Sequence, residues 1–443
     1  MPRKADIVKI SYNDLVAACS NNKHDKSVNI DNLIEQAFGV GSTTSSSLGI
    51  IAITNIPTLT KLRSNLLPLA PKLATLPPHQ LEQVTAPQSQ YQVGWSHGRE
   101  KLEGDKLDFS KGSYYANPLT DDLVESLLER RRCYLQLGDE SHDDDDKKKR
   151  MTNELQKWDQ SLQSIETEEE LRQLANANPA FFAPNVWPTE SLPELEGAFK
   201  EMGRLIHQVG VYLAKCCDLY VAARCPGYNP NTLENVLVHS KCCKARLLHY
   251  FATEEDDDDD ASDSSSHKDG NIDENGGGSN AFDDTQFSTW CGWHNDHGSL
   301  TGLVPAMYHD RNGNIVPCPD ENAGLYIKSR SGELVHVQLP ENALAFQVGE
   351  TAQVHTGGWL HATPHAVRGC KKKGDGISRS TFAVFMEPEY HSSMDLPVGR
   401  SVADVQCEEA EKSLPKSVRT LKSRWKQGNN FGMFSNATFA AFH

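Results

Sequence analysis

Histidine and carboxylate side chains with the spacing of metal ligands lie in the second half of this sequence. His294 and Asp296 are separated by one residue, and side chains at positions i and i+2 of an extended strand point to the same side. One more imidazole from a distant strand would complete two histidines and one carboxylate. Such a set covers one face of an iron(II) ion and leaves positions open for substrate and oxygen. A lone His-x-Asp is common by chance, so a surface histidine is the competing interpretation.

A distal histidine and an inward-facing arginine sharpen this prediction. His365 lies far downstream of His294, beyond several predicted strands. Residues 378–385 (SRSTFAVF) predict a strand in which Arg379 and Thr381 share one face. An arginine that points into a core is costly unless it meets an anion, and a guanidinium beside a hydroxyl suits a carboxylate. The predicted ligand is the distal carboxylate of a dicarboxylic co-substrate; a buried Arg–Asp pair is the competing interpretation.

The order of these motifs resembles that of the iron(II)/2-oxoglutarate oxygenases, specifically the isopenicillin N synthase-like branch. The resemblance is strong over residues 190–400 and weaker over 1–120, and chance rarely supplies so many elements in order. The matching segments, each with the family pattern that it resembles, are RLLHY at 246–250 (LRLxxY), HNDHGSLTGL at 294–303 (HxDxGxLTxL), AGLYI at 323–327 with SGELV at 331–335 (the GLQV…DGxW hairpin), FQVGE at 346–350 (xNxGD), TPHAV at 363–367 (xxHRV) and RST at 379–381 (RxS).

The resemblance implies a set of site residues and a reaction. It selects His365 over His361, so that the implied iron(II) ligands are His294, Asp296 and His365. The residues implied to hold 2-oxoglutarate are Arg379, Thr381 and Tyr250. O2 would be the oxidant, with ascorbate an optional addition. A small-molecule substrate would be hydroxylated or otherwise oxidised, with release of succinate and CO2.

Two competing hypotheses share the same fold. One is a catalytically inactive binding or regulatory protein that docks through an acidic segment, and the complete ligand set argues against it. The other is an iron oxidase that does not use 2-oxoglutarate, and Arg379 with Thr381 argues against that. Thr381 replaces the usual Ser of the family and keeps its hydroxyl, whereas residues 370–376 (CKKKGDG) lengthen the connection from His365 to Arg379.

The elements that must position these residues predict an α+β fold. Residues 195–221 carry apolar side chains at three- and four-residue steps, which predicts a helix. From residue 285 onward the period changes to two, and short strands with Gly and Pro turns indicate a double-stranded β-helix (jelly-roll) core flanked by N-terminal helices. The other expected strands are 48–56, 335–339, 344–348 and 379–386; the other expected helices are 33–37, 60–84 (broken by prolines) and 414–425.

The net charge of −16 over 443 residues belongs mostly to one segment. Residues 254–274 hold eleven acids and one lysine, and we predict that 254–280 is a disordered acidic insertion. The predicted division is an N-terminal oxygenase-family region (1–120), a charged helical segment (121–190), the jelly-roll core (191–400) and a C-terminal helix with an aromatic tail (401–443). The acidic balance argues against nucleic acid as a partner, because phosphates need a basic surface.

The cysteines and the N-terminus indicate a cellular setting. Eleven cysteines without a CxxC pair predict reduced thiols in the cytosol. The first residues (MPRKADIVKI) lack the apolar stretch of a secretory signal, and no apolar run reaches the length of a membrane span. We therefore expect a cytoplasmic protein, with the nucleus also open, that acts without a membrane.

Overall fold

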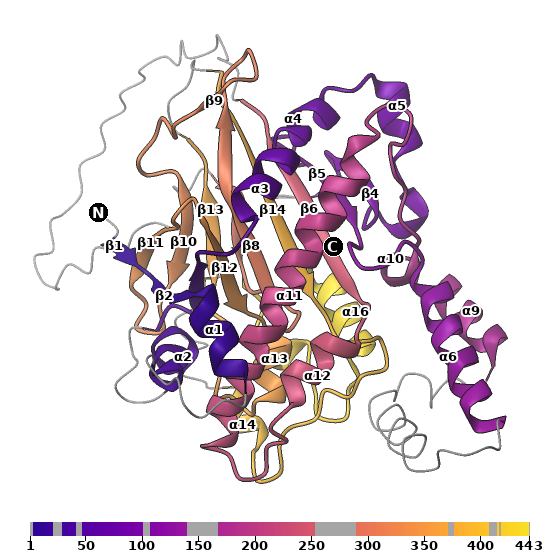
Figure 1. Cartoon of the computed structure of the whole chain (residues 1–443), viewed down its shortest axis with the longest axis vertical. Coiled ribbons are helices and arrows are strands. Elements are labelled where there is room, and N and C mark those ends of the chain that lie inside the picture. The colour runs from indigo at the N-terminus through magenta and orange to yellow at the C-terminus, as the bar shows by residue number, and fades with distance from the viewer. Residues whose placement is uncertain are drawn as a thin grey trace, which may run out of the picture.

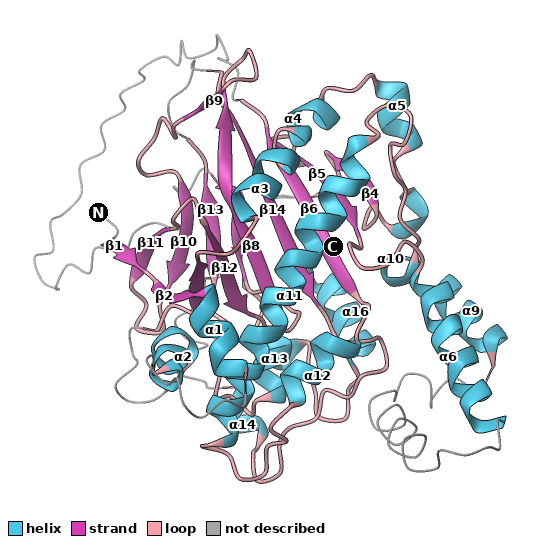
Figure 2. Cartoon of the chain, in the orientation of Figure 1, coloured by secondary structure: helices cyan, strands magenta, loops and turns pink. Residues whose placement is uncertain are grey.

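Two β-sheets and one long helix dominate the computed structural model of the chain, which has a mixed α+β fold (Figures 1 and 2). The structure describes residues 3–20, 29–40, 47–100, 107–139, 167–252, 289–370, 376–406, 414–415 and 418–442. The predicted acidic insertion at 254–280 lies outside these residues. No helix in this part of the chain has the length and apolar character needed to cross a bilayer.

The larger sheet has the strand order β2-β3-β12-β8-β14-β6-β5-β4, with β9 paired to β8. Its outer strands come from the N-terminal part of the chain, and its centre comes from the part that carries the predicted site. The strands are β2 (Val8–Ser11), β3 (Ile50–Thr54), β4 (Gly94–His97), β5 (Lys111–Ala116), β6 (Cys243–Tyr250), β8 (Leu300–His309), β9 (Ile315–Val316), β12 (Ala343–Val348) and β14 (Ser378–Met386).

The smaller sheet has the order β1-β11-β10-β13-β7. From β6 onward the chain passes back and forth between the sheets: β6, β8, β12 and β14 lie in the larger sheet, and β7, the β10–β11 hairpin and β13 lie in the smaller one. The strands of the smaller sheet are β1 (Arg3–Asp6), β7 (Thr289–His294), β10 (Gly324–Lys328), β11 (Leu334–Gln338) and β13 (His365–Arg368).

Apolar side chains fill the space between the two sheets. Ile50 and Ala52 of β3 pack there against Ile327 and Val335 of the smaller sheet. Their neighbour Ile51 faces the other way, into the core under the helices. Because β3 is buried on both faces, its sequence is a continuous apolar run, and the strand predicted at 48–56 is confirmed.

The helix α11 (Glu194–Ala222) runs across the outer face of the larger sheet (Figure 1), and it confirms the helix predicted at 195–221. Its side chains Phe199 and Ile206 pack against Phe346 and Phe382 of the sheet. The remaining helices are α1 (Tyr12–Cys19), α2 (Ile30–Phe38), α3 (Leu59–Leu66), α4 (Leu69–Ala74), α5 (Pro78–Gln83), η1 (Pro87–Ser89), α6 (Leu123–Asp139), α9 (Glu168–Ala177), α10 (Pro179–Phe182), α12 (Thr232–His239), α13 (Glu350–His355), α14 (Val402–Val405), η3 (Leu421–Ser423) and α16 (Phe431–Phe442).

The C-terminal segment differs from its prediction. Within 414–425 the described residues form only the short helix η3, and the expected aromatic tail instead forms α16. Leu421 and Trp425 are buried at helical spacing, but they reach the core from a tight turn. The spacing of apolar side chains indicates which residues are buried. A compact turn can bury residues at the same spacing as a helix, so the spacing alone does not distinguish the two.

Candidate metal centre

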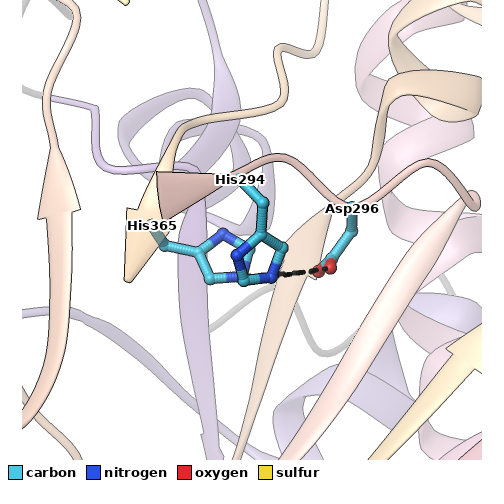
Figure 3. A group of neighbouring side chains, drawn as sticks. All are labelled: His294, Asp296 and His365. Carbon is cyan, nitrogen blue, oxygen red and sulfur yellow. Dashed lines mark ion pairs between the residues drawn. The ribbon is translucent and has the colours of Figure 1, made fainter. Parts of the chain in front are cut away.

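Three predicted ligands meet where β7 ends and β13 begins (Figure 3). His294 and His365 are register partners on these two strands, and their ring centroids lie 4.3 Å apart. Asp296 follows in the loop to β8. The Nε2 atoms of His294 and His365 each lie 3.8 Å from a different carboxylate oxygen of Asp296. One ligand atom from each residue falls within 4.8 Å of the others, so a single ion can touch all three.

The other ring nitrogens of the two histidines are bound to the backbone. Nδ1 of His294 lies 2.8 Å from the carbonyl oxygen of Gly292, and Nδ1 of His365 lies 3.3 Å from that of Thr363. Because a carbonyl only accepts, each Nδ1 carries a proton, and each Nε2 can present a lone pair to the centre when the ring is neutral.

Asp296 supplies the charge that this donor set needs. Its side chain is only 4% exposed, and among the described residues its buried Oδ2 accepts no hydrogen bond. A buried carboxylate oxygen without a donor is costly unless a cation meets it. Two imidazoles and one carboxylate on one side of a space are the ligands that a non-haem iron(II) ion takes. The residues therefore fit such an ion.

The surroundings push the pKa values of the two histidines in opposite directions. Burial, and then the charge of His294, lower the pKa of His365 to about 4. Burial also lowers the pKa of His294, but the charges of Cys291 and Asp296 outweigh it and raise the pKa to about 9. At neutral pH, His365 is ready to bind a cation, whereas His294 must first release a proton.

The ligand-bearing loop is held by the backbone at the start of α13. The N–H of Glu350 donates to the carbonyl of Asp296 at 2.8 Å, and the N–H of Gly349 donates to that of Ser299 at 3.0 Å. A Cβ atom on Gly349 would lie 2.1 Å from the carbonyl oxygen of Gly298. The loop approaches so closely that only glycine fits at position 349.

Arg379 and Tyr250 lie side by side on the inner face of the larger sheet. Arg379 is 7% exposed and is the register partner of Tyr250 on β6 and of Tyr308 on β8. The guanidinium carbon lies 4.9 Å from the centre of the Tyr250 ring. Val367, two residues beyond His365, packs into the same small cluster as Tyr250. The guanidinium of Arg379 thus lies in the space between the two sheets. It faces β13, the strand that begins at the predicted ligand His365.

The hydroxyl of Thr381 has a partner within the sheet. It donates to the carbonyl of Val304 at 2.8 Å, where the register between β14 and β8 shifts. A hydroxyl has one proton. To donate to a bound carboxylate, this hydroxyl would have to turn away from the Val304 carbonyl, so the role of Thr381 in binding 2-oxoglutarate stays a prediction.

A buried ion network beside Tyr250 was not foreseen from the sequence. Lys111, the register partner of Tyr250 on β5, has its Nζ 2.5 Å from Asp108 and 3.0 Å from Glu100. Arg246 also pairs with Glu100. Burial raises the pKa of Glu100, but Arg246 and Lys111 outweigh it and lower the pKa to about 2. The four charges cancel, and only the tertiary fold brings them together.

Three other histidines, close in sequence to the predicted ligands, lie outside this cluster. His355 is buried in α13, with Nε2 2.9 Å from the carbonyl oxygen of Ser393. His297 follows the ligand Asp296, and its Nε2 lies 3.4 Å from Glu387. Among the described residues, neither these two nor His361 belongs to a group with metal-ligand geometry.

Comparison with known proteins finds similar structures but no similar sequence. No protein-family model and no curated protein matches the chain. A full-length Neurospora crassa protein, crystallised in complex with alpha-KG, superposes with a TM-score of 0.56 at 18% identity, over 99% of this chain and 96% of that one. The likeness is one of fold.

Two other structures show the same likeness. A 2OG-Fe(II) oxygenase family protein from Caulobacter crescentus has a TM-score of 0.57 at 14% identity and covers 99% of both chains. JOX2 in complex with 2OG, Fe and JA has a TM-score of 0.51 at 13% identity, over 91% of this chain and 81% of that one. At these identities the comparison supports a shared architecture, and residue roles rest on the geometry above.

Proposed function

We propose that this protein is an Fe(II)- and 2-oxoglutarate-dependent dioxygenase that oxidises a small molecule and releases succinate and CO2. The observation that carries the proposal is the convergence of His294, Asp296 and His365, with both Nε2 atoms turned toward the carboxylate. The motif resemblance favours the isopenicillin N synthase-like branch.

The arrangement of the strands supports the same proposal. Strands β12-β8-β14-β6 of the larger sheet and β11-β10-β13-β7 of the smaller one alternate along the chain, as they do in a double-stranded β-helix. Two structures with the same architecture, the Neurospora crassa protein and JOX2, contain alpha-KG and 2OG with Fe, respectively. We assign the jelly-roll core to residues 191–400, with the N-terminal region 1–120 adding strands to the edges of both sheets.

The protein residues have distinct tasks in this mechanism. His294, Asp296 and His365 would hold the iron(II) ion, which supplies the chemistry with O2 and 2-oxoglutarate. The carboxylate of Asp296 offsets part of the ion's charge, and the backbone carbonyls behind the two histidines fix their rings.

Arg379 would bind the far carboxylate of 2-oxoglutarate. It lies against the ring of Tyr250 in the space between the sheets, where little water competes for its hydrogen bonds. Tyr250 limits the directions in which the guanidinium can turn. A co-substrate held at that end would direct its keto and near carboxylate oxygens toward the three ligands.

The test is iron(II)-dependent formation of succinate from 2-oxoglutarate by the purified protein over a panel of small molecules. Wild type and the control variant His361→Ala should turn over alike, and Asp296→Ala should lose activity. Equal inertness of wild type and Asp296→Ala over the whole panel would overturn the enzyme proposal. Oxidised product without any need for 2-oxoglutarate would favour the iron oxidase instead.

A further inference from the structure

A buried ion pair joins the C-terminal segment to α13, the helix whose first residue holds the metal loop. Nη2 of Arg424 lies 2.6 Å from Oε1 of Glu350, and the two side chains are 3% and 2% exposed. Burying two opposite charges is unfavourable unless the pair is close and well bonded. A hydrogen-bonded ion pair is directional, so it adds to the apolar packing a constraint on how the two segments approach each other.

Glu350 also hydrogen-bonds to the predicted metal ligand Asp296 and to its neighbour Asn295. Its N–H donates to the carbonyl of Asp296 at 2.8 Å, and its Oε1 accepts from the side-chain amide of Asn295 at 3.3 Å. The backbone of Glu350 thus holds the carbonyl of Asp296, while its carboxylate holds the side chain of the preceding residue, Asn295.

Arg424 in turn reaches α16. Nη1 of Arg424 donates to Oγ1 of Thr438 at 3.0 Å. The same helix touches the metal loop a second time, because the ring of His297 stacks on Phe431 with centroids 5.9 Å apart and lies 5.8 Å from Phe439. The helix α16 and the ligand loop are thus joined by ring contacts and by the Arg424–Glu350 bridge.

We propose that Glu350 and Arg424 are positioning residues that set the place of Asp296, so that the C-terminal segment is part of the metal centre. This inference rests on the proposed function, because it takes the three ligands to bind iron(II). Neither residue touches the ion. Each acts through the loop that carries the carboxylate, and the pair acts as a unit.

Anaerobic titration with Fe(II) alone measures this role apart from catalysis. Arg424→Met leaves Glu350 buried without its cation and frees the loop, so the Kd for Fe(II) should rise about 10- to 100-fold, the range for partners that orient metal ligands. The matched control is Arg224→Met, because Arg224 pairs with Asp31 at 2.7 Å and with Glu35 at 3.2 Å on α2. Its Kd should stay within about twofold of wild type.

A double-mutant cycle distinguishes positioning from general stability. Glu350→Gln, Arg424→Met and the double variant should each weaken Fe(II) binding to a similar extent, because the first loss already breaks the unit. Losses that multiply in the double variant, or a lowered Tm with an unchanged Kd, would overturn the proposal.

Two further measurements keep the outcome clear. If Arg424→Met does not fold, Thr438→Val removes the bond between Arg424 and α16, together with the bond from the Thr438 hydroxyl to the Phe434 carbonyl within that helix. It should raise the Kd about two- to fivefold, and an unchanged Kd then counts against the proposal. If wild type itself binds no Fe(II), or Asp296→Ala binds as well as wild type, the proposed function fails. If wild type binds and only the variants are unaffected, the positioning role alone fails.

Discussion

The two histidines of the candidate metal centre have the same kind of side chain but different pKa values. His365 is buried beside a positive neighbour, which lowers its pKa to about 4, whereas Cys291 and Asp296 overcome the effect of burial on His294 and raise its pKa to about 9. At neutral pH the imidazole of His365 is therefore neutral, whereas that of His294 is protonated. Metal binding must displace one proton, and it comes from His294.

This difference predicts how metal affinity depends on pH. Below about pH 9 the proton on His294 competes with the ion, so the apparent Kd for Co(II) should rise about tenfold as the pH falls from 8 to 7, above the pKa of about 7 at which Cys291 loses its charge. His365 adds nothing in that range. Cys291→Ala removes the charge that holds the proton and should flatten the dependence above pH 7. Anaerobic titrations at pH 6, 7 and 8 check this, and equal slopes in both proteins would contradict it.

A second prediction at this scale concerns Arg379. Arg379→Met removes the cation that would meet the far carboxylate, so the KM for 2-oxoglutarate should rise about 30- to 100-fold, or ~2–3 kcal/mol, while the Kd for the metal stays unchanged. The control is Arg63→Met, because Arg63 donates to the carbonyls of Pro305 and Ala306 on β8. If both variants raise the KM equally, Arg379 has no specific role in binding 2-oxoglutarate.

The ligand residues could be named from the sequence, but their supports could not. The motif order selected His294, Asp296 and His365, and the structure brings them together. Asp296 lies just past the end of β7, so the strand rule that placed it beside His294 applies only approximately. The partner of Glu350 lies 74 residues away, and no local pattern predicts a contact between two such distant turns.

Individual elements were predicted well where one physical rule governs them. The strands β11, β12 and β14 follow the expected segments, since alternation or continuous burial fixes their character. The prediction of a helix over residues 414–425 was wrong, because the buried residues at helical spacing there belong to a tight turn. The twelve residues of α16 contain no charge, so they lacked the amphipathic pattern that marks a surface helix.

The contact between the metal loop and the start of α13 gives a prediction for these elements. Gly349→Ala places a methyl group against the carbonyl of Gly298, so the loop must shift and the Kd for Fe(II) should rise about tenfold or more. Gly197→Ala is the matched control: nothing lies within 4 Å of its new Cβ, and alanine should stabilise α11 by about 0.5–1 kcal/mol with no change in the Kd. Metal titration and urea unfolding of both variants measure this. An unchanged Kd in Gly349→Ala would show that the loop tolerates the shift.

At the scale of the whole molecule, the candidate metal centre lies where the chain passes from the smaller sheet to the larger one. His294 and His365 lie on the smaller sheet, and Asp296 begins the connection to β8 of the larger one. The fold survives at 14–18% identity in structures that cover nearly the whole chain. Such divergence is possible because apolar cores accept many substitutions that keep volume and pattern. The three side chains that meet at the end of β7 allow far fewer exchanges, because each must offer a ligand atom.

This position of the site predicts that metal binding stabilises the entire fold. An ion that binds the folded chain alone should add about 2.7 kcal/mol to the free energy of unfolding at a free concentration of 100 times its Kd. Thermal unfolding with and without Fe(II) under anaerobic conditions should therefore show a higher Tm for wild type. The same shift should appear in His361→Ala and vanish in Asp296→Ala, since only the second loses a predicted ligand. A shift that persists in Asp296→Ala would mean that the ion stabilises the protein from another place, and a shift lost in His361→Ala would make that histidine a candidate ligand again.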